Sequence, residues 1–226
     1  MQPWIHLATA TTTDGAMLRL LRRGEEFSIR LEDGNELMNS RLSASEEALA
    51  VLAVDRLDRR QAPRILIGGL GMGFTLRAVQ GVVGSDACLV VSEIVPELIA
   101  WGTEHMADVF GDCLADPRVE VRTGDVGATI REVTSAFDAI LLDVDNGPDG
   151  LTRAGNDALY SDAGLRAARR ALTPGGVLAV WSAAPDPKFS QRLSRSGFET
   201  SVKTVRATRS KRGARHTIWL ARRMID

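Results

Sequence analysis

The sequence has few of the residues that mark disulfide-rich, zinc-binding or membrane-spanning proteins. Its two cysteines, Cys88 and Cys113, belong to no Cys-x-x-Cys or Cys/His cluster, so reduced, buried thiols are expected rather than a disulfide framework or a zinc site. The three histidines, His6, His105 and His216, have no metal-ligand spacing either. No apolar run reaches the roughly 18 residues of a membrane span, and the first residues lack an export signal. We therefore expect a cytoplasmic protein without a metal.

Excess charge of one sign is also missing from the chain as a whole, with 28 Lys/Arg against 29 Asp/Glu in 226 residues. Residues 192–223 are the exception, since they hold ten Lys/Arg and one acid, Glu199. Such a segment indicates either a hairpin with a solvated face or a nucleic-acid surface. Only Phe198 and Trp219 are aromatic there, so we favour the hairpin and do not expect nucleic acid as a partner.

From residue 65 onward, short apolar segments alternate with helical patterns five times. The apolar segments are nearly continuous in Val, Ile and Leu, which is typical of parallel strands covered on both faces. The pattern predicts a doubly wound α/β domain. The expected strands are "RILIGG", "ACLVVSEI", "VEVRTGDV", "FDAILLDV" and "GVLAVWSA", and the expected helices span 74–80, 95–109, 127–133, 156–172 and 187–196.

Two further segments, "ETSVKTVRA" and "HTIWLARR", predict an antiparallel hairpin that completes a mostly parallel seven-stranded sheet. Before residue 65 the pattern changes, and residues 1–42 predict a small N-terminal β extension with a turn at "DG". Residues 43–226 form the predicted main domain. Its first helix should start at Ser43, which has capping-box spacing to Glu46.

A glycine-rich loop, "ILIGGLGMGF", follows the first buried strand of the main domain. Glycines let the backbone turn tightly and approach a ligand without Cβ obstruction. The spacing fits neither the dinucleotide fingerprint G-x-G-x-x-G nor a P-loop with Gly-Lys-Ser/Thr. What remains is G-x-G-x-G over Gly69, Gly71 and Gly73, a loop suited to a nucleoside without a pyrophosphate.

Acidic residues end the next two expected strands. Glu93 lies twenty residues beyond Gly73, where it can accept both hydrogen bonds of a ribose diol; the alternative is a helix N-terminal residue that favours the dipole. Asp125 ends the following strand. It can accept a hydrogen bond from an adenine amine, or it can serve as an N-cap.

The stretch "FDAILLDVDNGPDG", residues 137–150, crowds carboxylates at the mouth of the fourth strand. In open α/β sheets ligands bind at the carboxyl ends of the strands where the strand order reverses. Asp143 should therefore face the glycine loop across that crevice. Beside it we expect Asp145, Asn146 and Tyr160 to contact the substrate.

Five ordered motifs resemble a known family. They are "LIGGLGMGFTLRA", "SEIVPELIAW", "DPRVEVRTGDV", "FDAILLDV" and "LYSDAGLRAARRALTPGGVLAVWS", and they are similar to the spermidine synthase (polyamine aminopropyltransferase) group. That group lies within the class I S-adenosylmethionine-dependent transferases. The resemblance covers roughly residues 35–185 and implies a Rossmann-like class I methyltransferase fold.

The resemblance also implies roles for individual residues. Gly69, Gly71 and Gly73 would surround the amino-acid part or thioether of the nucleoside, Glu93 would hold the ribose, and Asp125 the adenine amine. Asp143 matches the first acid of the family's D-x-[ST]-D-P motif, and the N-terminal β extension matches the strands that help cover the cleft.

Departures from the family concern the polyamine side of the site. The motif here is "DVDNGP", so its second acid is replaced by Asn146 or displaced to Asp145. The family's Tyr-His-Glu group falls near "SEEALAVL", where Glu46 and Glu47 are present but Tyr and His are not. The family's Gln falls at Trp181 or Ser182.

Because the nucleoside positions are kept and the polyamine positions are altered, we expect an S-adenosylmethionine-dependent alkyl transfer, with methyl transfer as the main hypothesis. The first alternative is aminopropyl transfer from decarboxylated S-adenosylmethionine to a cationic amine. The second is a non-catalytic nucleoside- or RNA-binding module. Asp143 is the candidate base, or else a group that only binds substrate. A small-molecule substrate is expected, no membrane partner, and a homodimer is one candidate assembly.

Overall fold

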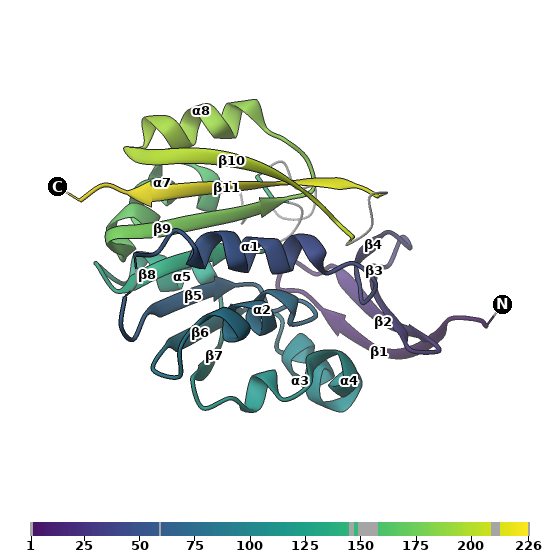
Figure 1. Ribbon diagram of the computed structural model, residues 1–226. Coiled ribbons are helices and arrows are strands. Elements are labelled where there is room, and N and C mark those ends of the chain that lie inside the picture. The colour runs from purple at the N-terminus through teal and green to yellow at the C-terminus, as the bar shows by residue number, and fades with distance from the viewer. Residues whose placement is uncertain (1, 59, 145–146, 149–157, 209–212, 226) are drawn as a thin grey trace.

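The computed structural model describes residues 2–58, 60–144, 147–148, 158–208 and 213–225. These residues form a four-stranded antiparallel sheet and a seven-stranded mixed sheet (Figure 1). The strands of the smaller sheet are β1 (Ile5–Thr11), β2 (Met17–Arg23), β3 (Glu26–Leu31) and β4 (Glu36–Asn39). The strands of the larger sheet are, in spatial order, β10 (Phe198–Arg206), β11 (Arg215–Arg223), β9 (Leu172–Ser182), β8 (Phe137–Leu142), β5 (Arg64–Gly68), β6 (Cys88–Glu93) and β7 (Val119–Thr123).

The predicted fold class is confirmed by the topology of the larger sheet. Strands β9, β8, β5, β6 and β7 pair in parallel, and β11 pairs antiparallel with both β9 and β10. The chain therefore has the mostly parallel seven-stranded sheet of the class I methyltransferase-like fold, and its last two strands are the predicted hairpin.

Helices cover both faces of this sheet because its central strands are apolar on both sides. Ile65 and Ile67 of β5 pack into one core cluster, while Leu66 packs into another on the opposite face. Helices α1, α2 and α3 contribute to the first cluster, and α5, α7 and α8 to the second. The helices are α1 (Ala44–Val54), α2 (Phe74–Val82), α3 (Pro96–Glu104), α4 (Ala107–Phe110), α5 (Val126–Arg131), α7 (Asp162–Ala171) and α8 (Pro187–Arg195).

Two local predictions differ from the structure. The helix expected over 95–109 is broken into α3 and α4, because the fully buried Met106 leaves helical geometry with φ −114° and ψ 27°. The capping box at α1 is also wrong. Ser43 is the N-cap but makes no side-chain cap bond, and its hydroxyl donates instead to Glu47 at 2.9 Å. Glu46 is thereby left available for another role.

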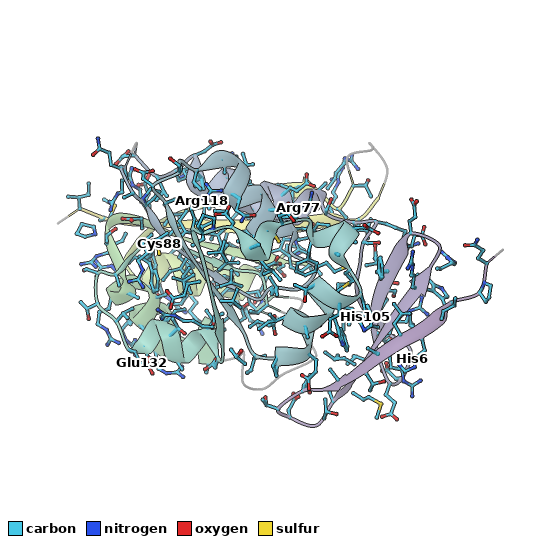
Figure 2. All side chains as sticks on the ribbon, turned by 90° about the horizontal axis from the view of Figure 1, so that it is seen from below. His6, Arg77, Cys88, His105, Arg118 and Glu132 are labelled. Atoms are coloured by element: carbon cyan, nitrogen blue, oxygen red, sulfur yellow. The ribbon has the colours of Figure 1, made fainter. Side chains whose placement is uncertain are left out.

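The four-stranded sheet lies at the carboxyl ends of the parallel strands. Figure 2 places Cys88, the first residue of β6, at the end of the molecule opposite His6 of β1. The starts of the parallel strands therefore point away from β1–β4, and their ends point toward them. None of the described helices is long and apolar enough to cross a membrane. Of the two thiols, Cys113 is buried and Cys88 is partly exposed.

Candidate functional site

Strands β5 and β8 are hydrogen-bonded neighbours, so the loops that follow them meet at one point of the sheet edge. The backbone N–H of Asp143 donates to Gly68 O at 2.9 Å. A Cβ on Gly69 would lie only 2.4 Å from the carbonyl oxygen of Asp143, and Gly69 has φ +88°. Glycine is required here because two backbones approach closely at a positive φ. The structure thus brings the glycine loop and Asp143 together, at the point where the strand order reverses.

The other two predicted loop glycines have different surroundings. Gly71, at φ +53°, lines both cavities described below, and a Cβ there would meet only the Met38 side chain, at 3.5 Å. Gly73 is the N-cap of α2, and a Cβ there would press on the Phe110 ring at 3.0 Å. Of the three, Gly71 therefore presents the most open backbone to a ligand.

Glu93 ends β6 and is 5% exposed. Its Oε2 accepts a hydrogen bond from Leu70 N at 2.9 Å, and its Oε1 accepts one from Val95 N at 2.8 Å. Burial raises the pKa of Glu93, while these backbone donors lower it. Each carboxylate oxygen can accept a second hydrogen bond, so the fixed carboxylate can still hold two hydroxyl groups of a ligand.

Asp125 follows β7 and combines the two roles that the sequence left open. Its side chain N-caps α5 by accepting from Gly127 N at 2.9 Å and Ala128 N at 3.1 Å. It also lines the same cavity as Glu93. Being an N-cap therefore does not remove its carboxylate from the cavity wall.

Asp143 is partly buried directly after β8 and lines two adjoining cavities. Thr75, in the first turn of α2, donates to its Oδ2 at 2.5 Å. Burial raises the pKa of Asp143 to about 6, and the Thr75 hydroxyl opposes part of that rise. The carboxyl group is thus fixed in direction and able to change protonation near neutral pH.

The first cavity, of about 280 Å³, lies between the glycine loop and the smaller sheet. Besides Gly69, Gly71, Glu93, Asp125 and Asp143, it is walled by residues of the first 38 positions. These were not singled out from the sequence, since their β pattern carries no motif. They are Thr12, Asp14, Ala16, Leu18, Leu31, Leu37 and Met38.

The second cavity, of about 100 Å³, shares Asp143 and Gly71 with the first. Glu46 of α1 and Trp181 of β9 line it, together with Phe74. Burial and the nearby Asp143 raise the pKa of Glu46 to about 7. Glu46 and Trp181 both fall at positions where the sequence departs from the polyamine-binding motifs of the resembled family, and that departure is the signal that could have identified them.

Acidic side chains outnumber basic ones in the described walls of both cavities. The described lining residues include the five acids Asp14, Glu46, Glu93, Asp125 and Asp143, and no Lys, Arg or His. Cationic ligands are attracted to such a wall and anionic groups are repelled.

Of the three predicted substrate contacts, Asp145 and Asn146 lie outside the described residues. Tyr160 is 2% exposed and packs edge-on against Phe189 at 5.6 Å, and it is absent from the described lining of both cavities. Its contact with substrate stays a prediction.

Comparison with known proteins confirms the resemblance to the spermidine synthase group. No family model matches the chain. A polyamine aminopropyltransferase of Mycobacterium tuberculosis is 28% identical over 167 residues, 73% of this chain and 30% of that protein. Polyamine aminopropyltransferase 2 of Pseudomonas aeruginosa is 32% identical over 120 residues, 51% of this chain and 32% of that protein. The chain thus spans about a third of the length of these curated relatives.

Solved structures agree on the fold. A spermidine synthase in complex with the transition-state analogue AdoDATO has a TM-score of 0.76 and 18% identity, covering 98% of this chain and 73% of that one. Spermidine synthase from Thermotoga maritima has a TM-score of 0.74 and 19% identity, covering 98% and 74%.

These findings correct the main functional prediction. Methyl transfer was preferred because the polyamine-contacting positions are altered, but the similar curated proteins are named as aminopropyltransferases. The prediction rested on the altered motif residues alone. The chain places another acid, Glu46, in the same cavity wall as Asp143.

Proposed function

We propose that this protein is an aminopropyltransferase that moves the aminopropyl group of decarboxylated S-adenosylmethionine to an amine. The single observation that carries this proposal is that Asp143 lines both cavities, one with the acids suited to a nucleoside and the other with a second acid suited to an amine. An electrophile in the first cavity and a nucleophile in the second would meet beside its carboxylate.

The charge of the cavity walls supports one of the two forms of the donor. S-adenosylmethionine carries a carboxylate, and its decarboxylated form carries only cationic groups. No described residue of either cavity wall is a Lys or Arg that could pair with that carboxylate, whereas five are acids. The walls therefore favour the decarboxylated donor. Glu93 would hold the ribose and Asp125 the adenine amine. Gly71 would leave room for the part of the donor that carries the sulfonium.

The reaction then needs little more than positioning and one proton transfer. The sulfonium already activates the carbon, so holding the amine in line with the leaving sulfur supplies much of the catalysis. The amine lone pair forms the new C–N bond, the C–S bond breaks, and methylthioadenosine leaves as a neutral thioether. An ammonium substrate must first lose a proton, which Asp143 can accept because its pKa lies near neutral pH.

Product analysis tests this function. The chain is incubated with decarboxylated S-adenosylmethionine and a panel of mono-, di- and triamines, and methylthioadenosine release and the amine's gain of one aminopropyl group are followed by mass spectrometry. We expect both products in equal amounts. S-adenosylmethionine serves as the matched donor control and should support no transfer. Absence of both products across the panel, or alkylation by S-adenosylmethionine alone, would refute the proposal.

A further inference from the structure

A short chain of hydrogen bonds leads out of the second cavity from Glu46. The Ser45 hydroxyl donates to Glu46 Oε2 at 2.6 Å, and Nδ1 of His216 lies 2.8 Å from the same hydroxyl oxygen. Ser45 is 1% exposed, and His216, on β11, is partly exposed. Residues from α1 and β11, far apart in the sequence, thus meet behind the cavity wall. They connect a carboxylate that lines the cavity to an imidazole nearer the surface.

The hydrogens of this chain have two consistent arrangements, because a serine hydroxyl has one hydrogen to donate. When Glu46 is ionised, Ser45 donates to it and accepts from Nδ1–H of His216. When Glu46 is protonated, it can donate to Ser45, which then donates to a bare Nδ1. Passing from the second arrangement to the first moves one proton from the carboxyl group to the imidazole, with no movement of heavy atoms.

We propose that Ser45 and His216 form a proton relay that carries the proton received by Glu46 out of the second cavity. The relay rests on the proposed function in one respect, since there the proton comes from the acceptor ammonium. The N–H bond of the ammonium breaks, Glu46 takes the proton directly or through Asp143, and Ser45 hands a proton to Nδ1 while receiving one. The imidazolium then releases its Nε2 proton to water. His216 touches no reacting atom, so it is a positioning and relay residue.

Acidic groups surround the Glu46 end of the relay, and an aromatic ring packs against its His216 end. Two acids act on Glu46: Asp143, which follows β8, and Glu47, which lies on the same helix as Glu46. Burial and Asp143 raise the pKa of Glu46 to about 7, and burial lowers the pKa of His216. The relay itself rests on geometry, since the Ser45 hydroxyl lies within hydrogen-bond distance of both groups. His216 also packs edge-on against Trp181 at 4.7 Å, which fixes the ring.

The first experiment measures the coupling between Glu46 and His216 in the absence of turnover. The ¹⁵N shifts of His216 are followed by NMR against pH in the ligand-free protein and in Ser45→Ala and Glu46→Gln. We expect the Nδ1–H form of neutral His216 once Glu46 ionises, with a second titration step from Glu46. Both signatures should disappear in each variant. A single, identical titration in all three proteins overturns the relay.

The second experiment measures the rate of aminopropyl transfer in relay variants. His216→Asn keeps a donor near the Nδ1 position but cannot carry a proton, and we expect kcat to fall roughly tenfold, with an unchanged KM for the nucleoside donor and a larger solvent deuterium effect. Ser45→Ala should do the same, and the double variant should be no slower than either single one. His6→Asn, on β1, is the matched control. Unchanged kcat in both single variants, or additive losses, overturns the relay.

The two experiments also separate this proposal from the proposed function. If the NMR coupling is present but the wild type transfers no aminopropyl group, the relay stands and the aminopropyltransferase proposal fails. If transfer is present but His216 does not sense Glu46, the relay fails and the proposed function stands.

Discussion

Asp143 combines three constraints in one residue. Its backbone N–H bonds to Gly68 at the end of β5, its carbonyl oxygen requires glycine at position 69, and its side chain lines both cavities. Only the side chain can take part in a reaction. A substitution that preserves the backbone and the side-chain shape should therefore separate the chemistry from the fold.

We expect Asp143→Asn to leave the fold and nucleoside affinity nearly unchanged and to lower aminopropyl transfer by at least about 100-fold, because the amide cannot accept the amine proton. The amide oxygen can still accept the hydrogen bond from Thr75. Initial rates at saturating donor and amine check this. A rate within twofold of wild type would remove Asp143 from the chemistry.

At Gly71 the expected effect is on binding. Valine there adds side-chain atoms to the wall that both cavities share, at φ +53° where a β-branched residue is strained. We expect Gly71→Val to lose measurable affinity for methylthioadenosine by calorimetry. Gly34→Val is the matched control, since Gly34 has φ +89° with open space around it and lies outside both described linings. An equal loss of affinity in both variants would show that backbone strain alone is responsible. Full affinity in Gly71→Val would show that the loop is only a turn.

At the scale of elements, the N-terminus of α5 depends on a side chain that also lines the first cavity. Asp125 caps the helix through two backbone N–H groups and also lines the first cavity. Serine is also a good N-cap but is shorter and uncharged. Asp125→Ser and Asp125→Ala should therefore separate helix capping from ligand binding.

We expect Asp125→Ala to lower the free energy of unfolding by about 1 kcal/mol through the lost cap, and Asp125→Ser to lower it by much less. Both should weaken methylthioadenosine binding by about tenfold, since either change removes the carboxylate acceptor. Chemical denaturation and calorimetry on the same preparations measure the two effects. Full affinity in Asp125→Ser would assign the residue to the helix alone.

For the whole molecule, the features that could be predicted from the sequence are those that depend on local residue patterns and on the alternation of strands and helices. The strand order and the meeting of Asp143 with the glycine loop follow from parallel strands ending at one sheet edge. Glu46 was noted at the altered polyamine motif but not chosen as a site residue. Its spacing to Ser43 also fits a capping box, and only its proximity to Asp143 in the fold decides between the two roles. His216 has no metal-ligand spacing in the sequence, and its contact with Ser45 could not be predicted because it joins residues 171 positions apart.

The paired acids should also make the stability of the whole ligand-free protein depend on pH. Folding raises the pKa of Asp143 from 3.8 to about 6 and that of Glu46 from 4.5 to about 7. A group whose pKa is raised by folding contributes stability that is full below its unfolded pKa and is lost as pH rises through the folded value. The contribution of this pair should therefore be present near pH 4 and lost between about pH 4 and pH 7.

An uncharged substitute should remove that loss. We expect Asp143→Asn to be more stable than the wild type at pH 8 by about 3 kcal/mol, from a shift of about two pKa units, and the difference to vanish near pH 4. Equilibrium denaturation across pH 4–8 measures it. A cationic amine that occupies the second cavity should restore wild-type stability at pH 8 and have little effect on the variant, because only the ionised pair attracts it. A stability difference that does not change with pH would mean that the two carboxyl groups do not titrate together in the folded protein.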